Sequence, residues 1–375
     1  MKFIYIGRVS CFMADAASIR VHNVANALQQ QGHQVDFICQ EGTVPGGKLD
    51  SDGRTCYGVF GEHTGKLAMW REWLLGTGAV RKLKALLQTT RYDGVILYNV
   101  PITTGKSVYD LCRKRGIAVF GDITEWYDIG RANGPFASVF AWLVDRRIRL
   151  LDPKCDGMIA ISPYLENYYT GKVPVFNLPP VFEENGRPNT SENSPYKFLY
   201  AGSPSKKDEL YNFIAAVKNI NRDGIRVQMT IIGAPIPEDS QALAEQGICY
   251  LPRMPHKAIL DALGQHDFSV LLRSNARYAK AGYSTKVAEA LYNGTPVFCN
   301  EIGGADRDIC HGGNGIKISA ADTQTIENAL TDILQMPPAM VQELKDRAFA
   351  FGQKKYARKN YEESLAEFMT KLVKA

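Results

Sequence analysis

The strongest constraint on the fold is a strand, helix and strand pattern in the second half of the chain. Residues 267–272 (DFSVLL) and 295–299 (TPVFC) are short apolar runs of the kind that forms buried parallel strands. The segment between them has the apolar spacing of a helix, which Ser284 or Thr285 can cap and which the Asn-Gly pair at 293–294 can end. This order predicts one half of a doubly wound α/β sheet.

The start of this helix is a candidate ligand site. In doubly wound sheets, ligands bind beyond the carboxyl ends of the strands, where helix N-termini offer free N–H groups and partial positive charge. Ser284, Thr285 and Lys286 lie at that end, and Glu289 lies one turn further along, off the apolar stripe. A phosphate at the helix start and a carboxylate for sugar hydroxyls would make a nucleotide-sugar site. An ordinary amphipathic helix with a solvated Glu289 is the alternative.

The same alternation of strands and helices runs through the rest of the chain. Strands are expected in the first half at 2–7, 34–39, 93–98, 116–121, 157–162 and 173–178, and in the second half at 197–201, 226–232 and 247–251. The polar segment 183–196 (EENGRPNTSENSPY) reads as a linker between the halves. We therefore expect two Rossmann-like domains, residues 1–182 and 197–354, facing each other across a cleft. The first βαβ unit lacks G-x-G-x-x-G, which weakens a dinucleotide-binding interpretation.

A family resemblance rests on residues 281–304 (AGYSTKVAEALYNGTPVFCNEIGG). They resemble the nucleotide-binding region of the family-four retaining glycosyltransferases, which have two Rossmann domains (the GT-B type). Members typically carry two glutamates separated by seven residues, then a small residue, Gly, Thr or Lys, Pro and Val. Glu289 and the following residues 293–297 match this pattern, whereas Ala281 stands at the first glutamate position. Lys286 precedes the retained glutamate by three residues, as in some members that build surface polysaccharides.

The resemblance also implies roles outside this segment. The first domain would bind the acceptor, and a final helix at about 355–375 would pack back on it. After the strand at 197–201, the family has an arginine soon after a glycine and a lysine a few residues later. Here Gly202 and Lys207 match, while Ser203 replaces the arginine. A lysine at this point can stabilise the charge that develops on a diphosphate leaving group. Arg273, at the end of another strand, either supplies the missing cation or has a surface role.

A carboxylate-rich segment, residues 122–128 (DITEWYD), follows the expected strand at 116–121. Asp122 and Glu125 at a strand's carboxyl end are suited to binding sugar hydroxyls or accepting a proton, and a solvated acidic loop is the alternative. The resembled family often has His-Glu or His-Asp here; Glu125 matches the acidic half and Thr124 stands where histidine is common. The first helix is expected at 19–31. Near its start, Arg20 and His22 could meet an acceptor or a phosphate, but we expect them to be solvated.

Composition excludes several classes of protein. A chain of 375 residues exceeds the size of one hydrophobic core, and 45% hydrophobic with 22% charged residues is typical of a soluble globular protein. The net charge of +5 does not identify an anionic partner, and we expect no nucleic acid. The eight cysteines include no C-x-x-C pair, so a structural zinc site is not expected. Two Asp-x-Asp patterns, at 50–52 and 306–308, are too short to indicate metal, so we predict neither a metal nor a cofactor.

Location is predicted from what the sequence lacks and from two basic, aromatic segments. No apolar run reaches the roughly 18 residues that span a bilayer, and the first residues do not resemble a signal peptide. This favours a cytoplasmic protein, soluble or peripheral on the inner face of the membrane. Residues 66–88 and 138–151 interleave Trp and Leu with Lys and Arg. They suit helices that touch anionic lipid, or helices that pack on a sheet with their charges in water.

We therefore expect a retaining glycosyltransferase that moves a sugar from a nucleotide-diphosphate donor to a glycan or a lipid-linked glycan in surface polysaccharide synthesis. Glu289 would bind the ribose, while Lys207, Lys286 and the helix start at Ser284 and Thr285 would hold the diphosphate. Glu125 or Asp122 would lie near the transferred sugar. Two other functions remain open: a nucleotide-sugar epimerase of the same architecture, and a non-catalytic binding protein that lacks the groups replaced by Ala281 and Ser203.

Overall fold

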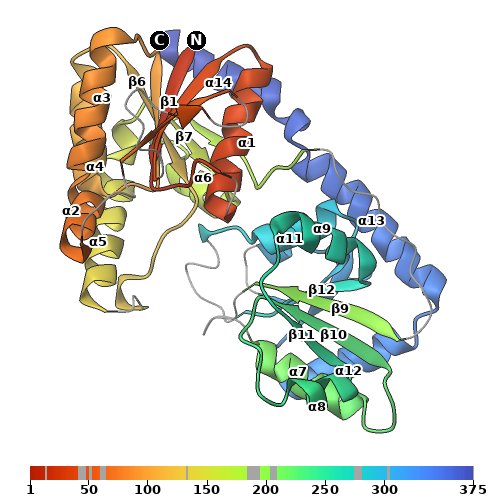
Figure 1. The fold of residues 1–375 in the computed structure, drawn as a ribbon. Helices are drawn as coiled ribbons and strands as arrows, with labels where there is room; N and C mark the ends of the chain where they lie inside the picture. The colour runs from red at the N-terminus through yellow and green to blue at the C-terminus, as the bar shows by residue number, and fades with distance from the viewer. Residues whose placement is uncertain are drawn as a thin grey trace. The chain divides into compact units, whose positions relative to one another are not determined.

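The computed structural model describes residues 1–12, 15–40, 48–49, 53–59, 65–131, 134–183, 195–202, 209–273, 281–301 and 305–374. It divides into two compact units (Figure 1). Unit 1 comprises Met1–Val181, Ala281–Tyr283 and Arg358–Ala375, and unit 2 comprises Phe182–Lys280 and Ser284–Ala357. Of the predicted site residues, Ser203 and Lys207 lie outside the described residues, as do both aspartates of the first Asp-x-Asp pattern.

Unit 1 is built on a sheet whose described strands run in the order β3-β4-β2-β1-β5-β6-β7-β8. Their bounds are β1 Lys2–Gly7, β2 Gln34–Cys39, β3 Lys48–Leu49, β4 Thr55–Gly58, β5 Gly94–Tyr98, β6 Ala118–Ile123, β7 Gly157–Ala160 and β8 Val175–Asn177. All neighbouring pairs are parallel except β3 with β4. The central strand β1 pairs Phe3 with Val35 on one side and with Gly94 on the other.

Helices cover both faces of this sheet because its strands are apolar on both faces. Helices α1 (Ala16–Gln30) and α14 (Glu362–Lys374) lie on one face, where they pack around Phe3 and Tyr5. On the other face, around Ile4 and Ile6, lie α3 (Thr77–Thr89), α4 (Ile102–Arg113), α5 (Pro135–Leu150) and α6 (Pro163–Tyr169). Helix α2 (Lys66–Leu75) precedes α3 beside α4. The period of two along β1 therefore assigns alternate residues to two separate cores.

Unit 2 repeats the architecture with described strands in the order β11-β10-β9-β12-β13-β14. The strand bounds are β9 Tyr196–Ala201, β10 Val227–Ile232, β11 Ile248–Leu251, β12 Phe268–Leu271, β13 Val297–Asn300 and β14 Gly315–Ile318. The helix bounds are α7 Leu210–Ile220, α8 Ser240–Glu245, α9 His256–Gln265, α11 Thr285–Tyr292, α12 Thr323–Leu334 and α13 Pro338–Tyr356. Helix α7 packs with α12, and α11 packs with α13 and α9, so this sheet too lies between two helical layers (Figure 1).

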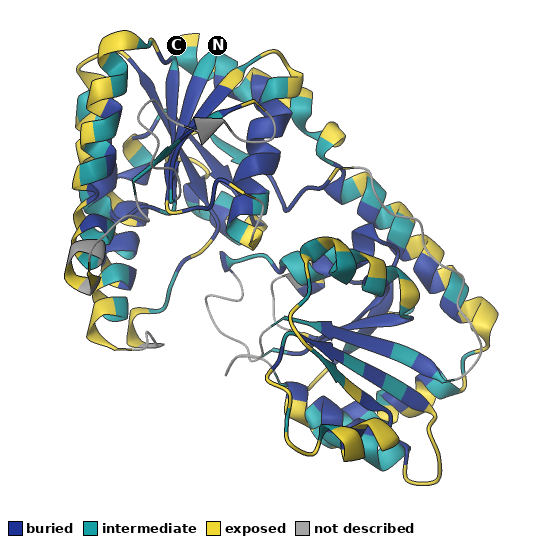
Figure 2. Cartoon of the chain, viewed as in Figure 1, coloured by how far each residue is buried: buried dark blue, intermediate teal, exposed yellow. Residues whose placement is uncertain are grey.

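Burial follows this layered design in each unit (Figure 2). The central strands are almost wholly buried, strands β4, β8 and β11 are only partly buried, and the helices are exposed on their outer sides. In unit 2, Phe198 of β9 stacks on Phe268 of β12 with ring centroids 5.0 Å apart, and both side chains have no exposed surface. Aromatic pairs of this kind stabilise neighbouring strands beyond the area that they bury.

Three local expectations need correction. Residues 66–88 form two helices, because Gly76 has φ +59° and a Cβ there would lie 2.3 Å from Thr104 Oγ1. Helix α1 begins at Ala16, earlier than its apolar residues suggest, because Asp15 and Ser18 form a capping box. Asp122 lies inside β6 rather than in the loop that follows it.

Candidate functional site

A pocket of about 270 Å³ in unit 1 lies where the strand order reverses. The chain passes from β1 to β2 on one side, and from β5 to β6 on the other, so the carboxyl ends of β1 and β5 frame the switch point where such folds bind ligands. The pocket is lined by Arg8, Ala17, Trp73, Tyr98, Asn99, Val100, Pro101, Glu125, Tyr127 and Phe140. Glu125, one of the two carboxylates that the sequence pattern proposed for sugar hydroxyls or proton transfer, lies in this lining.

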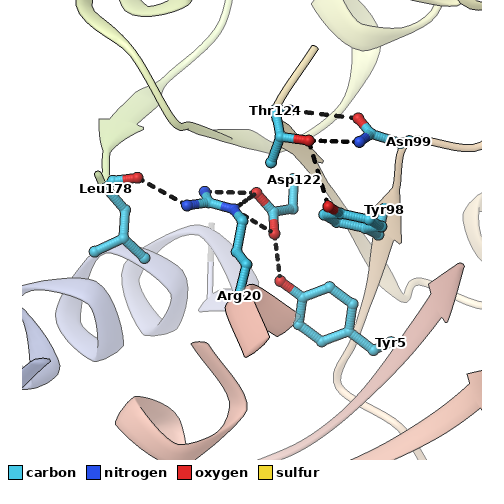
Figure 3. Close-up of polar contacts among 7 residues, drawn as sticks. All are labelled: Tyr5, Arg20, Tyr98, Asn99, Asp122, Thr124 and Leu178. Atoms are coloured by element: carbon cyan, nitrogen blue, oxygen red, sulfur yellow. Dashed lines mark hydrogen bonds and ion pairs between the residues drawn. The ribbon is translucent and has the colours of Figure 1, made fainter. Parts of the chain in front are cut away.

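Asp122 is held in a buried ion pair (Figure 3). Arg20 donates to its carboxylate through both Nε and Nη2, at 2.9 and 2.7 Å from Oδ1, and the Tyr5 hydroxyl donates to Oδ2 at 2.8 Å. Asp122 has no exposed surface, and Arg20 also donates to the carbonyl of Leu178 at 2.9 Å. Burial and the neighbouring carboxylate raise the pKa of Tyr5.

These contacts correct two expectations. Arg20 and His22 are buried rather than solvated. Because the side chains of β6 alternate between the faces of the sheet, Asp122 faces α1, and its carboxylate is engaged there instead of being open to a sugar. We therefore assign Asp122 a structural role.

Asn99 and Thr124 form a second polar link, directly beside the pocket (Figure 3). The amide of Asn99 donates to Thr124 Oγ1 at 2.6 Å and accepts from the Thr124 backbone N–H at 3.3 Å, while Tyr98 Oη lies 3.4 Å from the same hydroxyl. Asn99 has φ +45°, an unfavourable conformation that a structure maintains only where its surroundings fix it. Thr124, the residue that replaces the histidine of the resembled family, thus joins the ends of β5 and β6.

The remaining pocket groups combine charge with aromatic faces. The guanidinium of Arg8 lies 3.2 Å from the ring centroid of Trp73, a cation–π contact. Tyr127 hydrogen-bonds to the exposed carboxylate of Glu125, and burial together with this carboxylate raises the pKa of Tyr127. Burial lowers the pKa of Arg8. A pocket with one cation, one carboxylate and aromatic faces can bind sugar rings by stacking and sugar hydroxyls by hydrogen bonds.

Unit 2 contains its own switch point, between β9 and β12, and the start of α11 lies there. Ser284 is the N-cap residue of α11, and its side chain makes no capping bond. Its Oγ is buried and has no hydrogen-bond partner among the described residues. A buried hydroxyl without a partner costs roughly 1 to 3 kcal/mol, and a phosphate oxygen bound at this helix N-terminus would remove that cost. Thr285, the first residue of α11, is half-buried.

Gly202 and Lys286 lie against each other beside this helix start. Gly202 ends the β9 segment with φ +130°, and a Cβ there would lie 2.9 Å from Lys286 Nζ. The same ammonium group is 4.1 Å from the ring centroid of Tyr200. Glycine is therefore needed both for the backbone conformation and for the close approach of the lysine. The structure thus brings together four of the predicted donor residues: Gly202, Ser284, Thr285 and Lys286.

Glu289 has a partner that sequence reasoning missed. His256 Nε2 lies 2.9 Å from Glu289 Oε1, and the Glu289 side chain is 12% exposed. The hydrogen bond that His256 donates to the Glu289 carboxylate raises the pKa of His256, although burial opposes this. One feature of the sequence pointed to His256: it begins the helix α9 that follows strand β11, and ligands bind where helices follow strands in such sheets. The pairing itself spans 33 positions of sequence and could not be seen there.

The two remaining predicted positions, Arg273 and Ala281, are also described. Arg273 follows β12, and its backbone N–H and carbonyl each bond to the Asn300 side chain at 2.9 Å. Ala281 belongs to unit 1, where it is fully buried in an apolar core and its carbonyl accepts from Ser162 Oγ at 2.7 Å. A glutamate there would place a carboxylate among apolar side chains.

Comparisons with known proteins agree on the class. A family model described as Glycosyltransferase Family 4 matches residues 17–176, and one described as Glycosyl transferases group 1 matches residues 181–351. No curated protein matches the chain.

Three solved structures share its fold. Sucrose-phosphate synthase from Thermosynechococcus elongatus is 14% identical, with a TM-score of 0.76 over 99% of this chain and 98% of that one. HepE of Anabaena in complex with UDP-glucose is 14% identical, with a TM-score of 0.65 over 99% of this chain and 100% of that one. The lipopolysaccharide outer core galactosyltransferase WaaB is 16% identical, with a TM-score of 0.63 over the same shares.

The expectations on fold class and enzyme class are thereby confirmed, and the epimerase and the binding protein are not needed to explain the chain. Two parallel sheets, each between helical layers, form the GT-B architecture. The two family models together match most of the sequence. The chain belongs to the GT-B glycosyltransferases that use nucleotide-sugar donors, with a family 4 domain followed by a group 1 domain.

Proposed function

We propose that this glycosyltransferase moves a sugar from a nucleotide diphosphate to a hydroxyl of a glycan or lipid-linked glycan, with retention of anomeric configuration, in surface polysaccharide synthesis. The observation that carries the donor part is the buried Ser284 Oγ at the start of α11, which has no hydrogen-bond partner among the described residues, with the ammonium group of Lys286 packed against Gly202 nearby. HepE binds UDP-glucose with this fold, which makes a uridine diphosphate sugar the first donor to test.

The donor residues would bind different parts of the nucleotide according to their charge. The N-terminus of α11 and Lys286 would hold the diphosphate, whose negative charge grows as the glycosidic bond breaks. Glu289, oriented by His256, would accept hydrogen bonds from the ribose hydroxyls through its second carboxylate oxygen. Lys207, Ser203 and Arg273 are proposed as further diphosphate ligands. Lys207 matches the lysine of the resembled family, Ser203 stands at the position of the family's arginine, and Arg273 would supply the missing cation.

The pocket of unit 1 would bind the acceptor and the transferred sugar. Glu125, hydrogen-bonded to Tyr127, offers a carboxylate to sugar hydroxyls, and Trp73 offers an aromatic face. Retention requires no protein base of shifted pKa in this proposal, because the leaving phosphate can take the acceptor proton. WaaB is a lipopolysaccharide galactosyltransferase with this fold, which supports a glycan acceptor.

We propose that transfer needs no metal ion or other cofactor. The second Asp-x-Asp pattern is engaged in packing instead: the two oxygens of Asp308 contact Lys355 and the Tyr356 hydroxyl on α13. Asp306 is 4% exposed. A carboxylate whose oxygens already pair with an ammonium and a hydroxyl is a poor ligand for a divalent cation.

Exposed apolar residues support a peripheral contact with anionic lipid. On α5, Phe136, Val139 and Trp142 are 52%, 45% and 46% exposed and recur with helical spacing. The guanidinium of Arg146 lies 5.3 Å from the Trp142 ring. Helix α2 adds Leu67, 81% exposed, and joins α5 through the stacked rings of Trp70 and Phe136. Aromatic and aliphatic side chains beside arginine suit the interface of a bilayer.

The described residues form no helix that is long and apolar enough to cross a bilayer. We propose a cytoplasmic location on the inner face of the membrane, in line with the exposed apolar residues of α5 and α2.

A transfer assay tests the activity. The purified protein is incubated with UDP-glucose, UDP-galactose or another nucleotide sugar and a set of glycan and lipid-linked acceptors, with a chelator present. We expect one donor to give product with the anomeric configuration of the donor, read by NMR coupling constants. An inverted product would refute retention, and dependence on added metal would refute the metal-independent proposal.

Flotation with vesicles tests the lipid contact. The wild type should float with vesicles rich in phosphatidylglycerol, and Phe136→Glu/Trp142→Glu should not. Tyr211→Glu, at a residue of unit 2 that is 77% exposed, is the matched control. Equal flotation of all three proteins, or of none, would remove the membrane from the proposal.

A further inference from the structure

Three buried thiols meet on the β2–β4 side of the unit 1 sheet, and none of them lines the unit 1 pocket. Cys11 follows β1, Cys39 ends β2 and Cys56 lies in β4. Their Sγ atoms all lie within 4.8 Å of one another, and the residues are 2%, 0% and 0% exposed. We call these three residues the thiol cluster. The sequence gives no C-x-x-C signal because each thiol comes from a different segment of the chain.

The geometry of the thiol cluster is close to that of a trigonal metal site. Metal–thiolate bonds of about 2.3 Å place the sulfurs of a planar three-coordinate site about 4 Å apart. Sulfurs that already lie within 4.8 Å can reach that spacing by small changes of side-chain torsion. The surroundings are the apolar core shared with Phe37 and Val21. A dry site of soft ligands selects soft cations over hard ones.

A buried cation lies on the same face of the sheet. Arg54 precedes Cys56 by two positions, as Phe37 precedes Cys39, so all four side chains point toward α1. The guanidinium lies 5.5 Å from the Phe37 ring, and Nη1 lies 3.1 Å from His22 Nδ1 on α1. Arg54 is 2% exposed. Its positive charge would offset the net negative charge of a metal bound by three thiolates.

We propose that the thiol cluster binds one soft, thiophilic metal ion, of the class of Cu⁺, Zn²⁺ and Cd²⁺, through three cysteine sulfurs. Each sulfur loses its proton to solvent as its bond to the ion forms, so binding releases protons and strengthens with pH. The Cys39 thiol gives up its weak contact with the Tyr57 carbonyl, at 3.8 Å.

The ion would connect the pocket of unit 1 to the edge of its sheet. Cys11 lies three positions after Arg8, which lines that pocket. Between them, the Val9 carbonyl accepts a hydrogen bond of 2.8 Å from the backbone N–H of Gln40, the residue that follows β2. A metal bond to Cys11 would fix this segment to β2 and β4. Occupancy is therefore expected to change the affinity for the acceptor rather than for the nucleotide.

Cd²⁺ titration under a non-thiol reductant tests the proposal. The exposed thiols Cys249 and Cys310 are first replaced by serine to provide a clean background. In that background we expect a thiolate-to-metal charge-transfer band that saturates at one Cd²⁺ per chain, with release of protons. Cys39→Ser should weaken Cd²⁺ binding by about 100-fold or more. Loss of a metal ligand costs at least as much affinity as loss of a group that hydrogen-bonds to a ligand.

Cys112→Ser is the matched control, because Cys112 is fully buried in unit 1 but lies in the other core cluster. It should bind Cd²⁺ like the background protein. Circular dichroism verifies folding, and Cys11→Ser replaces Cys39→Ser if the latter does not fold. Absence of the band in the folded background protein, or equal bands in the background protein and the cluster variant, would overturn the proposal. Neither result depends on glycosyl transfer.

Discussion

His256 Nε2 lies 2.9 Å from Glu289 Oε1 and thereby fixes the carboxylate that the family pattern assigns to the donor ribose. His256 is the first residue of α9, and Glu289 lies within α11, so the contact joins two separate helices of unit 2. The contact has an electrostatic signature, since hydrogen bonding to Glu289 raises the pKa of His256.

This shift predicts a pH-dependent stability. The imidazole titrates near 6.5 in the unfolded chain and higher in the folded one, so its contribution is fully present below about pH 6.5 and is lost as pH rises through the folded pKa. The wild type should therefore exceed His256→Gln in free energy of unfolding by more at pH about 5.5 than at pH about 8.5. Urea denaturation at both values measures this. A difference that is constant with pH would show that the pair is not charged.

Gly202→Ala should weaken nucleotide binding through the displacement of Lys286. The new Cβ would lie 2.9 Å from Nζ, and φ +130° adds backbone strain. Gly224→Ala is the matched control, because Gly224 has φ +135° with no atom within 4 Å of its Cβ position. Both variants should lose about 1 to 3 kcal/mol of stability from strain, and only Gly202→Ala should lose affinity for a nucleoside diphosphate by calorimetry. Equal affinities would place the diphosphate elsewhere.

Asp122→Asn should destabilise unit 1 rather than remove a reacting group. Arg20 would keep its buried charge without a counter-charge, which typically costs about 3 to 5 kcal/mol. Tyr5→Phe removes one hydrogen bond from the same carboxylate and should cost about 1 kcal/mol. Denaturant midpoints check both values. If Asp122→Asn has normal stability but no transfer activity, Asp122 acts in catalysis rather than in folding.

Glu125→Gln should reduce transfer without affecting the donor. The carboxylate lies in the unit 1 pocket, while the predicted donor residues of known position lie in unit 2. We expect kcat/KM for the acceptor to fall about tenfold or more, the effect of losing one charge-assisted hydrogen bond, and the dissociation constant of the nucleotide to stay unchanged. Tyr127→Phe should also lower kcat/KM for the acceptor, by a smaller factor. A changed nucleotide affinity would contradict this division of roles.

Most of the fold could be predicted because its signals are local. The bounds of β1 and β2 match the ranges 2–7 and 34–39 that the apolar runs predict. The split at Gly76 was hidden because the contact that forbids a Cβ comes from Thr104, on another helix. The early start of α1 was hidden for a different reason: its cap, Asp15, lies four residues before Ile19, the first apolar residue of the expected helix.

The candidate site could be predicted where its residues lie in one segment of the chain. It could not be predicted where the contacts join two distant segments. Ser284, Thr285, Lys286 and Glu289 share one helix, so spacing alone grouped them. The partners of Asp122 and Glu289 lie 102 and 33 positions away in sequence, and the orientation of Asp122 depends on its register within β6. Side-chain pairing of this kind is set by tertiary structure, which periodicity cannot reveal.

The most direct test of the donor site is calorimetric binding of UDP, GDP, ADP and CMP to the wild type and to Glu289→Ala. We predict that one nucleotide binds tightly and that the variant loses about 1 to 3 kcal/mol of its binding free energy, as expected for lost charge-assisted hydrogen bonds. Binding of the same nucleotide to both proteins with equal affinity, or no binding to the wild type, would contradict the assignment of Glu289 and of the start of α11 to the donor.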